Sequence, residues 1–356
     1  MIRKINLENF TVFSKLSLEF SPRVNVIIGE NGTGKTHLLK ATCFLCTGGS
    51  VMNGGFSSDD GKINGALTDR LLRLFMPIEN KIGKLRSYGA DKKEKARMQA
   101  EFVPDSNLLL DFHSNSKTVT VQKKSVLDKK LTEPVMIPTK EVLSFMEGFA
   151  SLYSKYELSF DETYYNICLL LDLPPVRSQS LAEKSRWAME GIEKTIGGKF
   201  IFHGGGRVTF KAENGEFSAN TMAEGFRKFG MLSRLLETAA IQPGVSGPLL
   251  WDEPETNMNP KLVRLLVETL LELSRNGQQI IVATHDYVLL KWFDLLMDKK
   301  KEDHVRFHVL FRELDSGEIK AKSTDTYLQI PENAIAATFS DLYDSEIERS
   351  LGNKMQ

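Results

Sequence analysis

The feature that most constrains this chain is the segment Gly29–Thr36, which reads Gly-Glu-Asn-Gly-Thr-Gly-Lys-Thr and fits the pattern G-x-x-x-x-G-K-[ST]. The apolar run Val24–Ile28 before it predicts a buried strand, and His37–Thr42 after it predicts the start of a helix. A strand, a glycine-rich loop and a helix in this order are typical of a loop that binds nucleotide phosphates. A chance glycine-rich turn is the alternative, and the flanking strand and helix argue against it.

Each part of this loop has a chemical role in phosphate binding. Glycines let backbone N–H groups point at phosphate oxygens, and the N-terminus of the helix adds free donors. Lys35 would neutralise charge on the β- and γ-phosphates, and the Thr36 hydroxyl would hold Mg²⁺. The nucleotide-binding residues that we assign here are Asn31, Gly32, Thr33, Gly34, Lys35, Thr36 and His37.

Charge does not single out nucleic acid as a partner. The 356 residues include 46 Lys and Arg and 46 Asp and Glu, whereas a chain that coats DNA usually carries excess positive charge. The segment Lys84–Arg97 is a local exception, with six basic residues against two acidic ones. A solvated helix face or a loop is the simpler interpretation of that segment.

The cysteines and the N-terminus indicate an ordinary cytoplasmic protein. Cys43 and Cys46 form a single C-x-x-C inside a predicted helix, and without a second pair they are expected to be buried thiols rather than a zinc site. The segment Met1–Asn6 lacks the apolar core of a signal peptide, and no apolar run reaches the length of a membrane span. We therefore predict a cytoplasmic location and no membrane partner.

Hydrophobic periodicity divides the chain into three regions. In the first, it predicts a loop at about 48–65, a helix at 67–76, and strands at 2–7, 16–20, 98–103, 108–112, 117–122 and 135–137. In the second, it predicts helices at 141–153, 162–171 and 181–194. In the third, it predicts a hairpin at 200–211, helices at 223–240, 261–275, 287–297 and 339–351, and strands at 247–251, 279–283, 305–311 and 319–323.

These regions give three predicted units. They are an N-terminal lobe at 1–137 with a loop insertion at about 48–97, a helical subdomain at 138–198, and a C-terminal lobe at 199–356.

A second acidic motif complements the phosphate loop. The apolar strand before Asp252 would place this carboxylate at the carboxyl edge of the sheet, where it can hold Mg²⁺. Glu253, the next residue, could polarise the attacking water. Two adjacent acids after a strand are common, so it is their combination with the phosphate loop that makes them informative.

A third strand ends at the same edge. Ile280–Ala283 is followed by Thr284 and His285, and an imidazole there could hydrogen-bond the γ-phosphate. A structural helix cap is the alternative role of His285. We assign Glu253, His285 and Lys35 as catalytic residues, and Thr36 and Asp252 as metal ligands.

The order of these motifs resembles that of ABC-type ATPases, most closely their RecF, SMC and OLD branch, whose members are also called AAA-family ATP-binding proteins. The similarity rests on Ile5–Phe10, the phosphate loop, the Asp-Glu-Pro-Glu segment from Asp252 and the strand before His285. It covers residues 1–45 and about 200–300. It implies an α/β fold of the P-loop NTPase type, with a mixed sheet, an antiparallel N-terminal lobe and a helical insertion. It also implies ATP and Mg²⁺ as ligands and hydrolysis of ATP to ADP and phosphate.

By this resemblance, Thr221–Lys228 occupies the position of the family's signature motif. The start of that helix contacts a γ-phosphate held by a second protomer, so that a head-to-tail dimer, or a higher oligomer, sandwiches ATP. The residues assigned to this contact are Ala223, Gly225 and Arg227. Ala223 stands where the family usually has Ser, which removes one hydroxyl contact and points to slow hydrolysis.

Three further placements also depend on the resemblance alone. Met258–Pro260 would lie in the loop that crosses the dimer interface. Thr139–Glu141 is the placement for the family's glutamine switch, and Phe13 and Lys15 would lie near the adenine. An aromatic side chain on a hairpin is, however, more often part of a core.

Two functions remain open from the sequence. About 185 residues separate the phosphate loop from the signature position, too few for an SMC coiled coil, and the 71 residues after His285 contain no convincing nuclease motif. The first function is a regulatory ATPase that dimerises on ATP and controls a nucleic-acid-linked process or a separate effector protein, as in bacterial defence or repair. The alternative is a weakly hydrolysing nucleotide sensor or scaffold. A transporter motor is disfavoured because the Leu-Ser-Gly-Gly-Gln string is missing.

Overall fold

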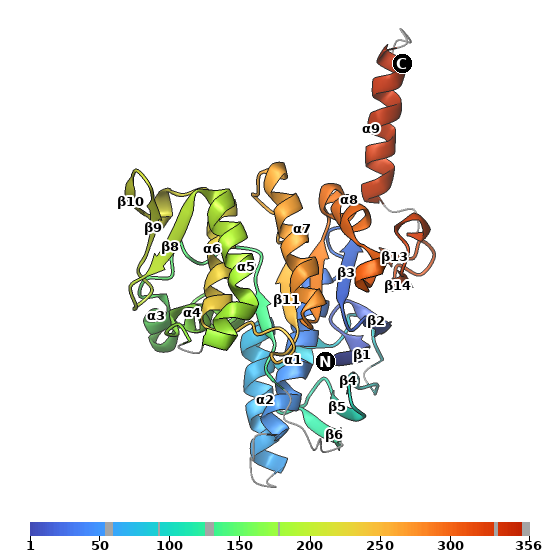
Figure 1. The fold of residues 1–356 in the computed structure, drawn as a ribbon. Helices are drawn as coiled ribbons and strands as arrows, with labels where there is room; N and C mark the ends of the chain where they lie inside the picture. Colours follow the sequence, from blue (N-terminus) through green and yellow to red (C-terminus); the bar gives the residue numbers. More distant parts are fainter. Residues whose placement is uncertain (54–59, 92, 125–131, 177–178, 331–333, 351–356) are drawn as a thin grey trace.

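The computed structural model describes residues 1–53, 60–91, 93–124, 132–176, 179–330 and 334–350. Within these residues the strands form three sheets, with the orders β2-β1-β4-β5-β6, β14-β13-β3-β12-β11-β7 and β10-β9-β8 (Figure 1). The strands are β1 (Ile2–Phe10), β2 (Phe13–Glu19), β3 (Val24–Gly29), β4 (Ala96–Phe102), β5 (Ser106–Phe112), β6 (Thr120–Lys124), β7 (Val135–Ile137), β8 (Gly198–Phe202), β9 (Val208–Ala212), β10 (Gly215–Ser218), β11 (Leu249–Asp252), β12 (Ile280–Thr284), β13 (Val305–Arg312) and β14 (Ile319–Thr324). The helices are α1 (Lys35–Asn53), α2 (Asp60–Phe75), α3 (Phe149–Lys155), α4 (Glu162–Asp172), α5 (Gln179–Ile196), α6 (Glu224–Glu237), α7 (Pro260–Arg275), α8 (Tyr287–Leu296) and α9 (Ala334–Ser350).

The six-stranded sheet is the centre of the molecule. Strands β7, β11, β12, β3 and β13 run parallel, and β14 pairs antiparallel at the edge. Successive residues of β3 point to opposite faces, so Val26 packs into one hydrophobic core and Ile27 into the other. Burial on both faces explains why β3, β11 and β12 consist mostly of apolar residues rather than alternating apolar and polar ones. These strands end at a common edge, where the phosphate loop and the acidic motif meet.

The antiparallel N-terminal lobe is confirmed. β1 pairs with β2 and β4, and β5 joins β4 to β6. Helix α1 shares a hydrophobic core with this sheet and with one face of the six-stranded sheet, through side chains such as Phe44 and Leu45. The predicted burial of Cys43 and Cys46 on α1 is also confirmed. The helix that starts at the phosphate loop is therefore clamped between two sheets.

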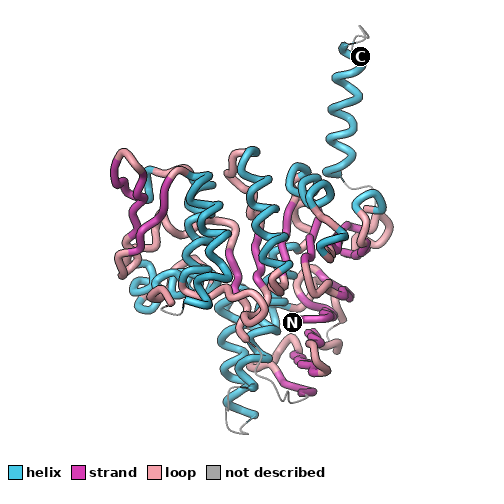
Figure 2. The backbone as a smooth tube through the Cα atoms, in the orientation of Figure 1, coloured by secondary structure: helices cyan, strands magenta, loops and turns pink. Residues whose placement is uncertain are grey.

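Helices α3–α6 and the small sheet β8–β10 form a body beside the other face of the six-stranded sheet (Figure 2). Helix α9 lies apart from that body and extends away from the rest of the molecule (Figure 1). It meets α8 through the stacked rings of Phe339 and Tyr287, whose centroids are 4.3 Å apart.

The prediction of a loop at 48–65 is wrong where the structure describes this segment. Helix α1 continues to Asn53, and α2 begins at Asp60. Residues 54–59 lie outside the described residues. Gly48, which suggested a loop, lies where an added Cβ would come 3.0 Å from Leu108 and 3.4 Å from Leu67. Glycine thus permits close packing of α1 on α2 and β5, and this packing outweighs its low helix propensity.

Two other element predictions need correction. The predicted helix at 141–153 is replaced by a short α3, and residues 141–148 form turns, because Glu141 turns inward to pair with Arg227 and Gly148 adopts φ +71°. The hairpin at 200–211 gains a third strand, β10. β13 pairs antiparallel with β14 and parallel with β3. The division into units at 137 and 198 stays a prediction.

Candidate functional site

The phosphate loop joins the end of β3 to the start of α1. Gly32 and Gly34 have φ values of +81° and +90°, a region that favours glycine. A Cβ on Gly34 would also lie 2.5 Å from Val12 and 2.7 Å from Phe13, so the β1–β2 turn presses directly on the loop. The glycines at these two positions are therefore required by the backbone itself.

Lys35 is buried within this loop. Its Nζ donates hydrogen bonds to the carbonyl of Gly29 at 2.7 Å and to that of Glu30 at 3.2 Å. Burial lowers the pKa of Lys35, and the nearby carboxylates of Glu253 and Asp252 oppose the shift. The cation thus rests on weak carbonyl acceptors that phosphate oxygens can replace.

The other residues that we assigned to the phosphate loop differ in how exposed they are to solvent. Asn31, Gly32 and Thr36 are exposed, whereas Thr33 is buried and its hydroxyl donates to the Glu30 carbonyl at 2.8 Å. His37 turns its ring toward Phe75 of α2, with centroids 5.8 Å apart, so it is the backbone N–H of this residue that remains suited to phosphate.

Asp252 lies next to the loop at the end of β11. Its Oδ2 accepts hydrogen bonds from the hydroxyls of Thr36 at 2.7 Å and Thr139 at 3.0 Å. Burial raises the pKa of Asp252, and these two hydrogen bonds oppose the shift. Its Oδ1 is buried and has no hydrogen-bond partner among the described residues. A carboxylate oxygen buried without a donor is costly, and Mg²⁺, held directly or through water, would satisfy it. The Thr36–Asp252 pair therefore fits a magnesium ion.

Glu253 and His285 lie together at the same edge of the sheet. The His285 Nδ1 is 3.0 Å from the Glu253 Oε1, and the Thr256 hydroxyl donates to the Glu253 Oε2 at 3.4 Å. The backbone of Glu253 has φ +47°, a left-handed conformation that costs free energy for a residue with a side chain. The Glu253 side chain is 22% exposed, which leaves it accessible to water. The sequence-predicted pair is thus brought into contact.

Lys228 of α6 is a residue that the sequence did not single out for this site. Its side chain is buried, and its Nζ donates to the carbonyls of Glu253 at 3.2 Å, Pro254 at 3.3 Å and Thr256 at 2.7 Å. These bonds hold the left-handed turn at Glu253 against the helix that begins at the signature position. No periodicity or spacing distinguishes such a lysine from a solvated one.

The three residues that we assigned to the signature contact have different environments. Ala223 is exposed at the N-cap of α6 and offers no side-chain acceptor, so the first N–H groups of the helix are uncapped. Gly225 is buried, and its missing Cβ lets α6 approach the Met258 backbone. Arg227 forms an ion pair with Glu141 at 2.8 Å, with both side chains mostly buried. Arg227 is thus held within its own chain in this structure.

The placements near Thr139 and Phe13 differ in outcome. The Thr139 hydroxyl donates to the Asp252 carboxylate, whereas Glu141 turns away from it and pairs with Arg227. Phe13 is fully buried beneath Gly34, so its side chain belongs to the core, as hairpin aromatics usually do.

Glu255, the last acid of the motif, was also not assigned from the sequence. Burial raises its pKa to about 7, and a hydrogen bond from the Thr284 hydroxyl at 2.5 Å opposes the shift. Since the folded chain holds this proton more tightly than the unfolded one, whose pKa is near 4.5, the free energy of unfolding falls as the pH rises from about 5 to about 7.5.

We expect Glu255→Gln to remove this part of the pH dependence, worth about 3 kcal/mol, because the amide stays neutral and keeps an oxygen for Thr284. Denaturant unfolding of both proteins at pH 5, 6, 7 and 8 measures it. If the free energy of unfolding changed with pH in the same way for both proteins, burial would not disfavour the ionised form of Glu255.

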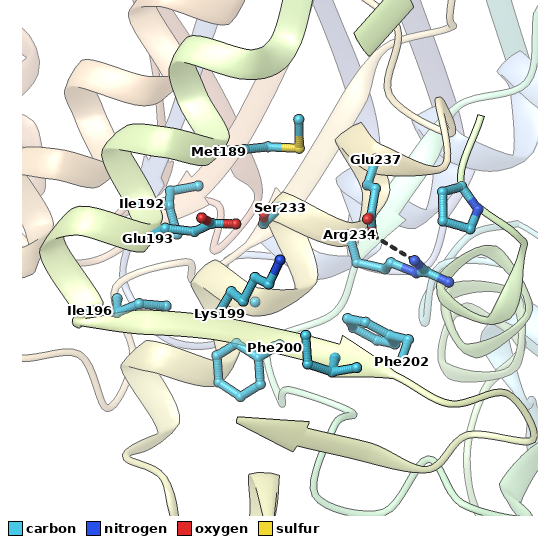
Figure 3. Close-up of a pocket in the computed structure, with 13 residues that line it drawn as sticks. Met189, Ile192, Glu193, Ile196, Lys199, Phe200, Phe202, Ser233, Arg234 and Glu237 are labelled. Atoms are coloured by element: carbon cyan, nitrogen blue, oxygen red, sulfur yellow. Dashed lines mark hydrogen bonds and ion pairs between the residues drawn. The ribbon is translucent and has the colours of Figure 1, made fainter. Parts of the chain in front are cut away.

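A separate cavity of about 190 Å³ lies between α5, β8 and α6 (Figure 3). Arg234 in its wall donates to the carbonyls of Leu171 and Leu173, pairs with Glu237 at 2.5 Å and lies over the Phe202 ring. These contacts satisfy the guanidinium inside the chain. The cavity is remote from the phosphate loop and carries no assignment.

Two domain families match this sequence. Residues 4–148, which contain the phosphate loop, match the family described as "AAA domain". Residues 153–291, which contain Glu253 and His285, match the family described as "AAA domain, putative AbiEii toxin, Type IV TA system". Among solved structures, an SMC head bound to the C-winged helix domain of ScpA superposes with a TM-score of 0.56 at 15% identity, over 91% of this chain and 97% of that one.

The chain thus has AAA-family domains and resembles ABC-type ATPases of the RecF and SMC branch. The SMC head domain from Thermotoga maritima has the same fold, with a TM-score of 0.50 at 14% identity, over 91% of this chain and 99% of that one. The chain also shares 30% identity over 115 residues with the DNA replication and repair protein RecF of Lysinibacillus sphaericus, 31% of this chain and 30% of RecF.

Two more curated relatives are similar to this chain. The RecF of Idiomarina loihiensis is 47% identical over 55 residues, 15% of this chain and 16% of its own. An "ATP/GTP phosphatase" of Helicobacter pylori is 23% identical over 187 residues, 51% of this chain and 44% of its own. Each of these matches spans less than half of the curated relative. None of the described helices combines the length and apolar character needed to cross a membrane.

Proposed function

We propose that this ATPase hydrolyses ATP to ADP and phosphate with Mg²⁺, dimerises on ATP, and thereby controls a nucleic-acid-linked process or a separate effector protein in the cytoplasm. The observation that carries the proposal is the convergence of Lys35, the Thr36–Asp252 pair and the Glu253–His285 pair at one edge of the sheet. Each group matches one requirement of phosphoryl transfer to water.

The chemistry follows from the positions of these groups. A water molecule attacks the γ-phosphorus, the bond from phosphorus to the β–γ bridging oxygen breaks, and Glu253 accepts the proton of the water. Lys35 neutralises charge that moves onto the bridging oxygen and the γ-phosphate. Thr36 and Asp252 would hold Mg²⁺, which would supply further positive charge beside the transferred phosphate. His285, 3.0 Å from Glu253, orients this base and can donate to the γ-phosphate.

Features of α6 support a dimer that closes on ATP. The uncapped N-terminus of this helix is exposed at Ala223 and suits an anion supplied by a second protomer. Asn257 comes just before the proposed interface loop at 258–260. Its side-chain amide donates a hydrogen bond at 2.9 Å to Glu224, which lies in the first turn of α6. The signature position and the loop after the acidic motif therefore form one surface.

The downstream role is inferred from the names of the relatives. RecF is a DNA replication and repair protein, and the SMC head is bound to a partner domain of ScpA. Three of the six basic residues at 84–97 form ion pairs within the chain: Lys84 with Glu79, Lys95 with Asp111 and Arg97 with Glu8. These pairs lower the positive charge that the segment offers to nucleic acid, which favours control of a protein effector.

A nucleotide sensor or scaffold with slow turnover is the second candidate. The absence of a hydroxyl at Ala223 favours it, because one hydrogen-bond donor to the partner's γ-phosphate is missing. The internal pairing of Arg227 with Glu141 favours it too.

Molecular mass in solution tests the two candidates. We expect Mg-ATP to convert monomer to dimer, and Glu253→Gln to make the dimer persist because the nucleotide is not consumed. Duplex DNA should co-elute with that dimer if the closed state clamps nucleic acid, and should not if a protein effector alone is controlled. A mass that does not respond to ATP would contradict regulated dimerisation and favour a fixed scaffold.

A further inference from the structure

Helix α9 carries apolar side chains that the rest of the chain leaves uncovered. The helix meets α8 where Phe339 stacks on Tyr287, and from there it extends away from the molecule (Figure 1). Beyond that contact, Leu342, Tyr343 and Ile347 are each more than half exposed. Helical positions three and four apart lie on one side, so these side chains continue a stripe that starts at Phe339. An apolar stripe on a helix indicates that another surface covers it.

The charges of α9 limit what that surface can be. The exposed part of the helix carries one base, Arg349, and four acids, which are Asp341, Asp344, Glu346 and Glu348. None of these acids forms an ion pair among the described residues. Glu346 follows Leu342 by four positions, so it lies within the stripe, whereas the other three acids lie on the opposite side of the helix. The covering surface must therefore combine apolar side chains with cations, and a second α9 would bring another acid into the contact instead.

The end of α8 offers such a surface. Leu295 and Leu328 are 67% and 87% exposed. Lys291 links them, because Leu295 is one helical turn further along α8 and Leu328 follows Tyr327, whose ring centroid is 4.1 Å from the Lys291 Nζ. Shortly after Leu295 come three exposed lysines, Lys299–Lys301, and none of them forms an ion pair within the part of the chain that the structure describes. We call Leu295, Leu328 and Lys299–Lys301 the α8 surface.

We propose that α9 of one copy of this chain docks on the α8 surface of a second copy. Its apolar stripe would cover Leu295 and Leu328, and Glu346 would lie beside Lys299–Lys301. The chain's own α9 leaves these side chains exposed, so the contact requires another molecule. Because every copy carries both α9 and the α8 surface, the contact is made twice in a twofold dimer.

This contact is separate from the proposed closure on ATP. Helix α9 lies far from α6, which carries the signature position, so the two contacts do not compete (Figure 1). A single helix face buries little area, and interfaces below about 1,200 Å² are typical of weak complexes. The nucleotide-free chain is therefore monomeric when dilute and dimeric when concentrated. Dimers closed on ATP present two copies of α9 and associate further.

Sedimentation of the full chain without nucleotide, from about 1 to about 300 µM, tests the contact. The unchanged protein should form a reversible dimer at the upper end of this range. Ile347→Glu should weaken that dimer by about 100-fold, because it places a charge where an apolar side chain is buried. Leu314→Glu, at a fully exposed leucine in the β13–β14 turn, is the matched control and should have no effect.

Reversal of single charges tests which surface α9 contacts. Glu346→Lys and Lys300→Glu should each weaken the dimer by about tenfold, and the two changes combined should restore it, because they exchange the charges across the contact. A chain that stays monomeric at every concentration, or that dimerises equally well with Ile347→Glu, would overturn the proposal. Loss of the dimer in Ile347→Glu but not in Lys300→Glu would indicate that α9 pairs with α9, and would overturn docking on the α8 surface. These measurements contain no nucleotide, so their failure would leave the proposed ATP hydrolysis untouched.

Discussion

Glu253→Gln is expected to lower the kcat for ATP hydrolysis by about 100- to 10,000-fold, the range that a positioned general base contributes. Glutamine is nearly the same size, and its amide can still contact Thr256, so the turn held by Lys228 should persist. The amide cannot accept a proton from the attacking water. Phosphate release measured under saturating Mg-ATP gives the change in kcat, and calorimetry should show an ATP affinity within about threefold of the unchanged protein.

The control for this variant is Glu268→Gln on the exposed face of α7, where the carboxylate pairs with Arg264. That change should leave kcat unchanged. If Glu253→Gln released phosphate at the normal rate, Glu253 would not be the base, and the contact with His285 would be structural.

Lys35→Ala is expected to weaken ATP binding by about 100-fold or more. The charge-assisted contacts of one cation with phosphate oxygens are worth roughly 3 kcal/mol, and each 1.4 kcal/mol changes affinity tenfold. Removing the ammonium also leaves Asp252 and Glu253 without the cation that offsets their charge near the triphosphate. Titration calorimetry with Mg-ATP measures the loss.

Lys40→Ala is the matched control, since Lys40 lies on the same helix but pairs with Asp161 at 2.8 Å, away from the loop. It removes the same charge and should leave ATP affinity nearly unchanged. Tight binding of ATP by Lys35→Ala would refute the phosphate loop, whereas equal losses in both variants would indicate a general effect of charge on α1.

The phosphate loop and the acidic motif were predictable because each depends on a short segment. Val24–Ile28 and the residues before Asp252 read as buried strands, and parallel strands end at a common edge. The meeting of Thr36 with Asp252, 216 positions apart, follows from that rule alone. The sequence order of the motifs was therefore enough to bring these groups together.

Other parts of the site depend on contacts that no local pattern carries. Lys228 lies on an amphipathic helix like many solvated lysines, and only the packing of α6 on the Glu253–Thr256 turn makes it a buried donor. Glu141 was predicted to begin a helix at 141–153, but its side chain pairs with Arg227 on a distant segment, and the helix begins only at Phe149.

The Lys228 contacts give the proposed dimer a property of its own. The N-terminus of α6 would face the ATP bound by the partner, whereas the carbonyls that Lys228 holds belong to the turn that carries Glu253 in the same chain. If α6 shifts when it contacts the partner's nucleotide, the Lys228 hydrogen bonds would therefore also move Glu253, the proposed general base at the chain's own nucleotide. The two ATP sites would then be thermodynamically linked, and each would alter the affinity of the other by the same factor. Binding curves of the dimer should accordingly depart from a single hyperbola, with a Hill coefficient that Lys228→Met returns toward one.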